Sequence, residues 1–170
     1  SHGPPGEVLS LQNCAAEPPQ HGGVSVRFLL APINPSDINT IEGKYPLSPS
    51  LPGVPGHEGV AEVTSVGPNV EGLKVGDRVV PLAPCSGTWR THATFPAASL
   101  HRVRSDIPLE AAATLCINPP TALAMLERFV QLAPGDTVVQ NGATSAVGRC
   151  VIQLAAAMGL RTINLMRPRD

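Results

Sequence analysis

The segment from residue 136 to residue 167 limits the fold of this chain more than any other part of the sequence. Along it, a β-rich run, a loop of small residues, an amphipathic helix closed by a glycine, and a second strand follow in order. These pieces are Thr137–Asn141, Gly142–Ala146, Val147–Met158 with Gly159, and Arg161–Met166. The order predicts a parallel β-α-β unit, and the junction between such a loop and its helix is where a nucleotide pyrophosphate binds.

The loop reads N-G-A-T-S-A-V-G and lacks the G-x-G-x-x-G spacing of many dinucleotide-binding proteins. Its small side chains still let backbone N–H groups approach a phosphate, and the following helix adds partial positive charge. Ser145 offers a hydroxyl donor, and Gly148 permits close packing of the helix on the strand. An ordinary β-to-α turn without a ligand is the alternative.

The end of the second strand bears on the choice of nucleotide. Proteins that bind NAD commonly place Asp or Glu there to hold the ribose 2′-hydroxyl. This chain instead reads M-R-P-R-D, so that Arg167 and Arg169 come before Asp170. Guanidinium groups form charge-assisted hydrogen bonds with the 2′-phosphate of NADP. The ending therefore favours NADPH, with a solvated basic turn as the alternative.

The part before residue 90 holds most of the 19 prolines and 16 glycines, which indicates a loop-rich β region. Its short runs predict a small antiparallel sheet or partly open barrel. The expected strands are Val24–Ala31, Gly59–Gly67, Asp77–Ala83 and Trp89–Pro96. Further along, Asp106 is expected to cap a helix over PLEAAATLCI, and Thr121–Leu132 predicts a stronger helix.

Charge and hydropathy argue against several classes of function. The net charge is −1 and no Lys/Arg block is present, so a nucleic-acid partner is not expected. No apolar run approaches the ~20 residues that span a bilayer. The scattered cysteines fit small buried side chains in a reducing compartment better than disulfides or a metal site. They are Cys14, Cys85, Cys116 and Cys150.

The only tyrosine of the chain, Tyr45, stands in the polar stretch NPSDINTIEGKYP, which its Pro and Gly residues predict to be a loop. A phenol keeps its proton at neutral pH, because its ordinary pKa is about 10. Tyr45 is therefore either a loop anchor or the donor of a hydrogen bond or a proton to a reacting group.

Six phrases follow the order found in the zinc-free enoyl-thioester reductases of the medium-chain dehydrogenase/reductase superfamily, and the chain resembles that family over nearly its whole length. They are APINPSDINTIEGKYP, LPGVPGHEGVAEVTSVGPNVEGLKVGDRVVP, GTWRTHATF, SDIPLEAAATLCINPPTA, LAPGDTVVQNGATSAVG and VIQLAAAMGLRTIN. The resemblance implies a GroES-like, partly open β-barrel catalytic domain at residues 1–118. It implies the first β-α-β unit of a Rossmann domain at residues 119–170, and a chain truncated at its C-terminus.

The resemblance also implies the activity, which is reduction of a trans-2-enoyl thioester of CoA or acyl carrier protein by NADPH. The setting would be mitochondrial fatty-acid synthesis, and the enzyme a homodimer. Tyr45 matches the catalytic tyrosine of the family, and Asn118 matches an asparagine that contacts the cofactor. The positions that match the pyrophosphate loop are Thr144, Ser145, Ala146 and Val147. Those that match the segment at the adenosine 2′-phosphate are Arg167, Pro168 and Arg169.

Two segments depart from the family. The phrase GHEG, with His57, is closer to the zinc alcohol dehydrogenases, and TLCINPPTA carries Cys116 and Pro120 in place of a glycine and a small or polar residue. Catalytic zinc needs three protein ligands, and NPSD offers no thiolate, so no metal is expected and His57 is expected to be a hydrogen-bonding loop residue. Trp89 either packs at the edge of the core or lines an acyl pocket.

Two other functions stay open on the sequence. A quinone reductase of the same superfamily also lacks zinc and uses NADPH, but it needs no acid at Tyr45. A truncated form without catalytic activity would act as an interaction or dimerisation module, for which the early end of the sequence is the only support. No secretory signal is visible, and a mitochondrial location rests on the resemblance alone.

Overall fold

The computed structural model describes residues 1–47 and 49–167, and the chain divides into two compact units between Thr114 and Leu115. The boundary expected from the sequence lay after Asn118. Each unit has a hydrophobic core of its own and is described separately below. Among the described residues, no helix is both long and apolar enough to cross a membrane.

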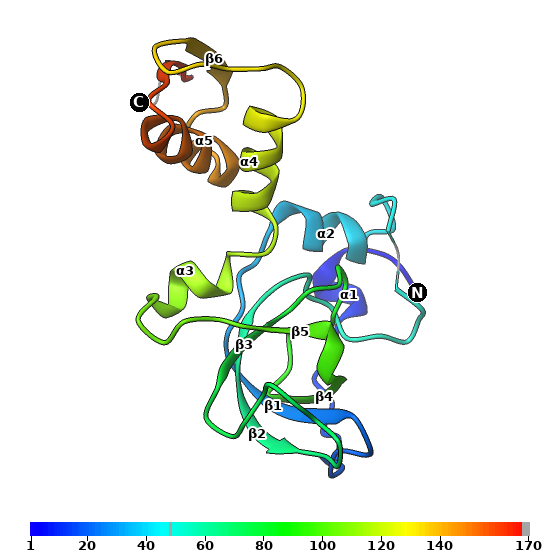
Figure 1. Cartoon of the computed structure of the whole chain (residues 1–170). Coiled ribbons are helices and arrows are strands. Elements are labelled where there is room, and N and C mark those ends of the chain that lie inside the picture. Colours follow the sequence, from blue (N-terminus) through cyan, green and yellow to red (C-terminus); the bar gives the residue numbers. More distant parts are fainter. Residues whose placement is uncertain (48, 168–170) are drawn as a thin grey trace. The chain divides into compact units, whose positions relative to one another are not determined.

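The first unit is built around a five-stranded antiparallel sheet in the order β4-β1-β2-β3-β5 (Figure 1). Its strands are β1 (Gly23–Leu30), β2 (Val60–Val66), β3 (Arg78–Pro81), β4 (His92–Pro96) and β5 (Leu100–Arg102). Its helices are α1 (Pro5–Val8), α2 (Pro35–Ile41), the 3-10 turn η1 (Ala97–Ser99) and α3 (Leu109–Ala113). The predicted antiparallel sheet is confirmed. Over the described residues it stays open and does not close into a barrel.

Alternating valines build the core of this unit. Val24 and Val26 of β1 are fully buried, and Val26 pairs with the equally buried Val63 of β2. Val79 of β3 and Leu100 of β5 complete the same cluster. Burying a side chain of this size stabilises the fold by roughly 1.5–3 kcal/mol. The period-two pattern that predicted the strands is therefore the pattern that fills the core.

Two features of the first unit differ from the sequence-based expectation. Strand β5 was not predicted, because it is three residues long and only Leu100 in it is buried. Asp106 does not cap α3, which begins at Leu109 directly after Pro108. Instead, the exposed Asp106 carboxylate accepts a 2.9 Å hydrogen bond from Nε of Arg104, and this pairing lowers the pKa of the Asp106 carboxyl.

The second unit contains a parallel β-α-β unit preceded by a helix. Its elements are α4 (Asn118–Glu127), β6 (Thr137–Asn141), α5 (Ala146–Ala157) and β7 (Arg161–Leu165). The pairing of β6 with β7 is parallel, as predicted. Helix α4 begins three residues earlier and ends five residues earlier than the expected 121–132 helix. Its buried residues meet those of α5 and Leu160 in one core, formed by Ala122, Leu126, Val151, Ala155 and Leu160.

Helix α5 covers only one face of the β6–β7 pair. Val138 of β6 is half-buried against the α4–α5 core. On the other face, Val139, Ile163 and Leu165 are 61%, 53% and 56% exposed. Parallel strands in proteins normally have both faces buried, so this second face is an apolar surface that is uncovered within the described part of the chain.

Candidate functional site

The stretch before Tyr45 is a helix rather than the predicted loop. Asn34 and Asp37 cap α2 reciprocally, and Pro35 occupies its first turn. The Asn34 backbone N–H donates to Asp37 Oδ2 at 2.7 Å. The sequence N-P-S-D therefore carried two helix-start signals, a capping pair and a first-turn proline, which its polar character obscured.

Tyr45 lies just beyond the end of α2, and its backbone is tied to that helix. The N–H groups of Lys44 and Tyr45 donate to the carbonyl of Asn39, at 2.8 and 3.2 Å. Gly43 supplies the positive φ of +74° that lets the chain turn there. Tyr45 is half-buried.

His57 packs against the Tyr45 ring and is almost fully buried, at 5% exposure. The two ring centroids are 5.3 Å apart and the ring planes meet at 72°, which is an edge-to-face contact. His57 Nε2 lies 2.8 Å from Thr40 Oγ1, and the His57 backbone N–H donates to Asp37 Oδ1 at 2.9 Å. The expectation that His57 is a hydrogen-bonding loop residue is confirmed.

Two carboxylates are buried beside this contact. Asp37 and Glu58 are each 1% exposed. Asp37 accepts from the backbone N–H groups of Asn34 and His57, and Glu58 accepts from Asn34 Nδ2 at 2.9 Å. Buried carboxylates are costly unless they are hydrogen-bonded, so these contacts rigidify the junction between α2 and the GHEG segment.

Cys85 is the nearest thiol to His57, with Sγ 3.7 Å from His57 Nε2. Burial, and to a lesser degree the nearby Asp37 charge, raise the pKa of the Cys85 thiol above its ordinary value. This disfavours the thiolate form, which is the form that binds metals and acts as a nucleophile. Within residues 1–47 and 49–167, no three His, Cys, Asp or Glu side chains are grouped so that they could hold a metal ion.

The GHEG and GTW segments pack tightly on each other. Gly56 has a φ of +103°, and a Cβ at this position would collide with Thr88 Oγ1 and lie 2.6 Å from Trp89 Cδ1. The N–H groups of Gly87 and Thr88 both donate to the Gly56 carbonyl. Only glycine satisfies this position, so the short GHEG turn fixes the start of the segment that leads to β4.

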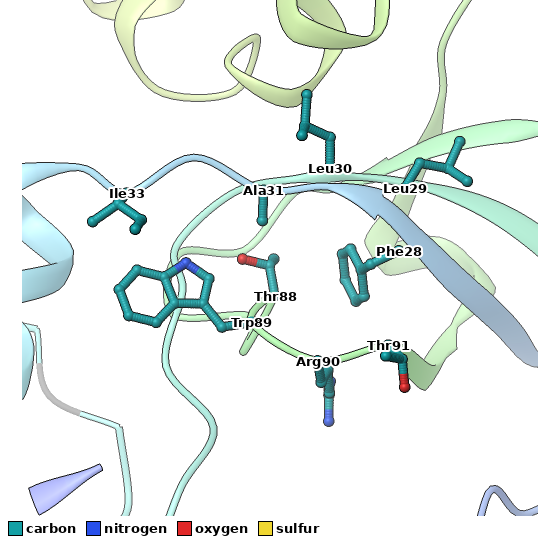
Figure 2. Close-up of a pocket in the computed structure, with 9 residues that line it drawn as sticks. All are labelled: Phe28, Leu29, Leu30, Ala31, Ile33, Thr88, Trp89, Arg90 and Thr91. Carbon is teal, nitrogen blue, oxygen red and sulfur yellow. The ribbon is translucent and has the colours of Figure 1, made fainter. Parts of the chain in front are cut away.

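An apolar cavity of about 410 Å³ opens beside Trp89 (Figure 2). Trp89 Nε1 donates to the Pro32 carbonyl at 3.1 Å, and this bond fixes the indole. Trp89 packs against Gly56 and lines this cavity; that the cavity takes an acyl chain stays a prediction. The cavity is lined by Phe28, Leu29, Leu30, Ala31, Ile33, Thr88, Trp89, Arg90 and Thr91.

In the second unit, the small-residue loop forms a tight cradle at the start of α5. Ser145 caps the helix, and its Oγ accepts from the Gly148 N–H at 3.1 Å. A Cβ on Gly148 would lie 2.6 Å from the Gly142 carbonyl oxygen and 2.8 Å from Ala143 Cα. Gly148 is therefore closely packed, but against the loop residues Gly142 and Ala143 and not, as had been expected, against the strand.

The predicted loop residues have different roles. Thr144, Ser145 and Ala146 are exposed at the turn into α5. Val147 is half-buried and its side chain packs against the α4–α5 core, so its backbone is the part that could contact a ligand. The first N–H groups of a helix lack intrahelical acceptors, which makes such a turn suited to an anion; here the Ser145 N–H donates to the Gly142 carbonyl and the Gly148 N–H to Ser145 Oγ.

An open cavity of about 540 Å³ lies beside the loop. It is lined by Ala143, Thr144, Arg149, Ile152, Asn164 and Met166. Asn164 Oδ1 accepts from Gln140 Nε2 at 2.7 Å, which ties the ends of β6 and β7 together. The sequence analysis missed Arg149, whose only signal is a basic residue directly after Gly148 in an otherwise small and apolar segment.

The structure brings some of the predicted site residues together and leaves others apart. Thr144, Ser145, Ala146 and Val147 form one turn, whereas Asn118 is the first residue of α4. Arg167 is exposed just after β7. Pro168 and Arg169 lie outside the described residues. Tyr45 belongs to the first unit and the other predicted residues to the second.

Comparison with known proteins gives two kinds of match. Residues 20–105 match the family described as the alcohol dehydrogenase GroES-like domain. The chain is 55% identical over 168 residues to the mitochondrial enoyl-[acyl-carrier-protein] reductase of Homo sapiens and 52% identical to that of Arabidopsis thaliana. Each alignment covers 99% of this chain and 45% of the relative, so the chain spans about half the length of the curated relatives it matches.

Solved structures give the same result. A mutant form of the enoyl thioester reductase from Candida tropicalis superposes with a TM-score of 0.92 at 33% identity, over 100% of this chain and 53% of that chain. An Etr1p/NADP/crotonyl-CoA complex gives 0.87 at 32%, over 99% and 53%. A quinone oxidoreductase of Escherichia coli complexed with NADPH gives 0.83 at 28%, over 96% and 50%.

Proposed function

Since this chain belongs to the alcohol dehydrogenase GroES-like domain family, we propose that it carries the catalytic tyrosine and the nucleotide loop of an NADPH-dependent reductase of trans-2-enoyl thioesters. The observation that carries this proposal is the 55% identity with a mitochondrial enoyl-[acyl-carrier-protein] reductase over 99% of the chain. That match includes both the Tyr45 segment and the loop before α5. The substrate is the thioester of CoA or of acyl carrier protein.

The residues of the second unit fit the diphosphate of a nucleotide. The cradle at Gly148 leaves no room for a side chain, and the first N–H groups of a helix are the kind of donors that bind an anion. At this turn the Ser145 N–H is already bonded to the Gly142 carbonyl and the Gly148 N–H to Ser145 Oγ, so the proposal concerns the N–H groups of Ala146 and Val147. Asn118 and Arg167 are proposed as further contacts, with Arg167 at the adenosine 2′-phosphate. When bound, NADPH supplies the hydride.

Tyr45 is the group proposed to handle the charge that the reaction creates. Addition of a hydride at C3 moves the double-bond electrons toward the thioester carbonyl, so negative charge gathers on its oxygen and on C2. A protonated phenol is able to donate a hydrogen bond to that oxygen or a proton to C2. Tyr45 is the only phenol in the chain and is half-buried beside His57, which suits this role.

The same superfamily offers quinone reduction as a second candidate, and solved quinone reductases do superpose on this chain. Activity on paired substrates separates the two. The natural full-length protein, given NADPH, is expected to reduce crotonyl-CoA with a kcat/KM at least about 100-fold above that for a quinone such as 1,4-benzoquinone. A higher kcat/KM with the quinone would favour the second candidate.

Location and assembly are proposed from the relatives. The matched curated relatives are named mitochondrial enzymes, and one matched structure is described as the Etr1p/Etr2p heterodimer of a mitochondrial 2-enoyl thioester reductase. We propose that this protein also acts in mitochondrial fatty-acid synthesis, and that it does so as a homodimer. Cell fractionation and sedimentation of the natural protein test the two statements separately.

Arg167→Ala in the full-length protein is expected to weaken NADPH binding by about tenfold or more, because a hydrogen bond to a charged group contributes roughly 1.5–3 kcal/mol. NADH affinity should stay within about twofold, since NADH lacks the 2′-phosphate. Fluorescence titration with both nucleotides measures the difference, with Arg102→Ala on the exposed end of β5 as the control. Equal losses for the two nucleotides would show that Arg167 does not read the 2′-phosphate.

A further inference from the structure

We propose that His57 is a positioning residue that holds the Tyr45 ring in the orientation needed for proton donation. This inference rests on the proposed function, because it takes Tyr45 as the acid. Nothing in the reaction itself requires a histidine in the GHEG segment. The structure nevertheless buries His57 to 5% exposure and places its ring edge-to-face with that of Tyr45, at a centroid distance of 5.3 Å.

The hydrogen bonds around Thr40 assign the His57 tautomer. The hydroxyl of Thr40 has a single proton, and it donates that proton to the Ser36 carbonyl at 2.9 Å. Its contact with His57 Nε2, at 2.8 Å, must then use the Nε2–H as donor and the Thr40 oxygen as acceptor. The proton is therefore on Nε2, and this bond sets the rotation of the imidazole about its side-chain torsions.

The same helix also positions the backbone of His57. Asp37, at 1% exposure, accepts from the His57 N–H at 2.9 Å and from the Asn34 N–H at 2.7 Å. Thr40 and Asp37 both belong to α2, and the end of α2 holds the Tyr45 backbone through Asn39. His57 and Tyr45 are thus both hydrogen-bonded to helix α2, and their two rings also contact each other directly.

Three contacts of the His57 ring bear on its role. Thr40 Oγ1 accepts a hydrogen bond from Nε2, Cys85 Sγ lies 3.7 Å from the same atom, and the ring packs edge-to-face on Tyr45. The contact with Tyr45 is the one that reaches the proposed acid. Since small displacements of a reacting group cost large factors in rate, a ring that limits the swing of the phenol affects kcat while leaving the nucleotide site in the second unit untouched.

A double-mutant cycle in the natural full-length protein tests this proposal, with crotonyl-CoA and NADPH as substrates. His57→Ala is expected to lower kcat about tenfold, with NADPH affinity within about twofold of wild type. In the Tyr45→Phe background, His57→Ala should lower kcat by less than about a further twofold, because no phenol is left to position.

Two further variants serve as controls. His57→Gln retains a hydrogen-bond donor for Thr40, so a loss of kcat in this variant is not explained by misfolding. It should lose kcat as His57→Ala does, and His101→Ala, on the exposed β5, is the control.

The outcomes separate the inference from the proposed function. A normal kcat for Tyr45→Phe overturns the role of Tyr45, and the positioning role falls with it. A low kcat for Tyr45→Phe together with a full tenfold further loss from His57→Ala overturns the positioning role alone. A wild-type kcat for folded His57→Gln also overturns the positioning role of His57 alone. If the ring contact positions Tyr45, the effects of His57→Ala and Tyr45→Phe on kcat are non-additive, and His57→Gln has a low kcat.

Discussion

Tyr45→Phe is expected to lower the kcat for enoyl-thioester reduction by about 100-fold or more, the range found when a general acid or an oxyanion donor is removed. Phenylalanine keeps the ring and so keeps the edge contact with His57. The change removes only the hydroxyl. NADPH affinity should stay within about twofold, because the loop proposed to hold the nucleotide belongs to the second unit. Steady-state kinetics with crotonyl-CoA and a fluorescence titration with NADPH measure the two quantities.

The physical reason is that the phenol acts only when charge develops. Before hydride transfer the thioester oxygen is a weak acceptor, and in the transition state it becomes an enolate-like oxygen, so the proposed hydrogen bond from Tyr45 is expected to strengthen at that point. Loss of such an interaction lowers kcat and kcat/KM together. A rise in KM for crotonyl-CoA alone, with kcat preserved, would mean that Tyr45 only helps to bind the substrate.

Gly148→Ala is expected to raise the Kd for NADPH by at least about tenfold. The new Cβ would lie 2.6 Å from the Gly142 carbonyl oxygen and 2.8 Å from Ala143 Cα, and both are backbone atoms that cannot rotate away. The loop must therefore shift, and the N–H groups that would meet the pyrophosphate shift with it. In an unconstrained helix the same change would stabilise the protein by about 1 kcal/mol, so a lower Tm would itself show that the cradle is strained.

A matched control is available for this prediction. Gly6 lies in α1 of the first unit, has no positive φ, and a Cβ there would meet nothing within 4 Å. Gly6→Ala should leave both the NADPH Kd and the Tm unchanged or slightly improve the Tm. If Gly148→Ala binds NADPH as well as Gly6→Ala does, then the loop is not the pyrophosphate site and the alternative of an ordinary β-to-α turn holds.

Local patterns were enough to predict much of the fold. The strand periodicity gave β1, whose Val24 and Val26 are fully buried, and the strand-loop-helix-strand order gave the parallel β6–β7 pair. Helix α2 was missed because its residues are mostly polar, although Asn34 and Asp37 cap it. Strand β5 was missed because a three-residue strand is stabilised by its pairing with β3 rather than by its own sequence.

The candidate site was predictable only in part. Tyr45 was found from its uniqueness and its family resemblance, and the loop from its small residues. The contacts of His57 were not predictable, because Asp37 and Thr40 are 20 and 17 residues away in sequence and meet it only in the folded sheet-and-helix arrangement. Cys85 reaches His57 from 28 residues away, in a segment with no local pattern that points to it.

The measurement that tests the central claim most directly is isotope tracing of the product. The natural full-length protein is given crotonyl-CoA and NADPH that carries deuterium at the transferred position of C4, in ordinary water. The account predicts butyryl-CoA with one deuterium at C3 and none at C2. With unlabelled NADPH in deuterated water, it predicts one deuterium at C2 and none at C3. Unchanged crotonyl-CoA under conditions in which the protein oxidises NADPH with a quinone would contradict the account.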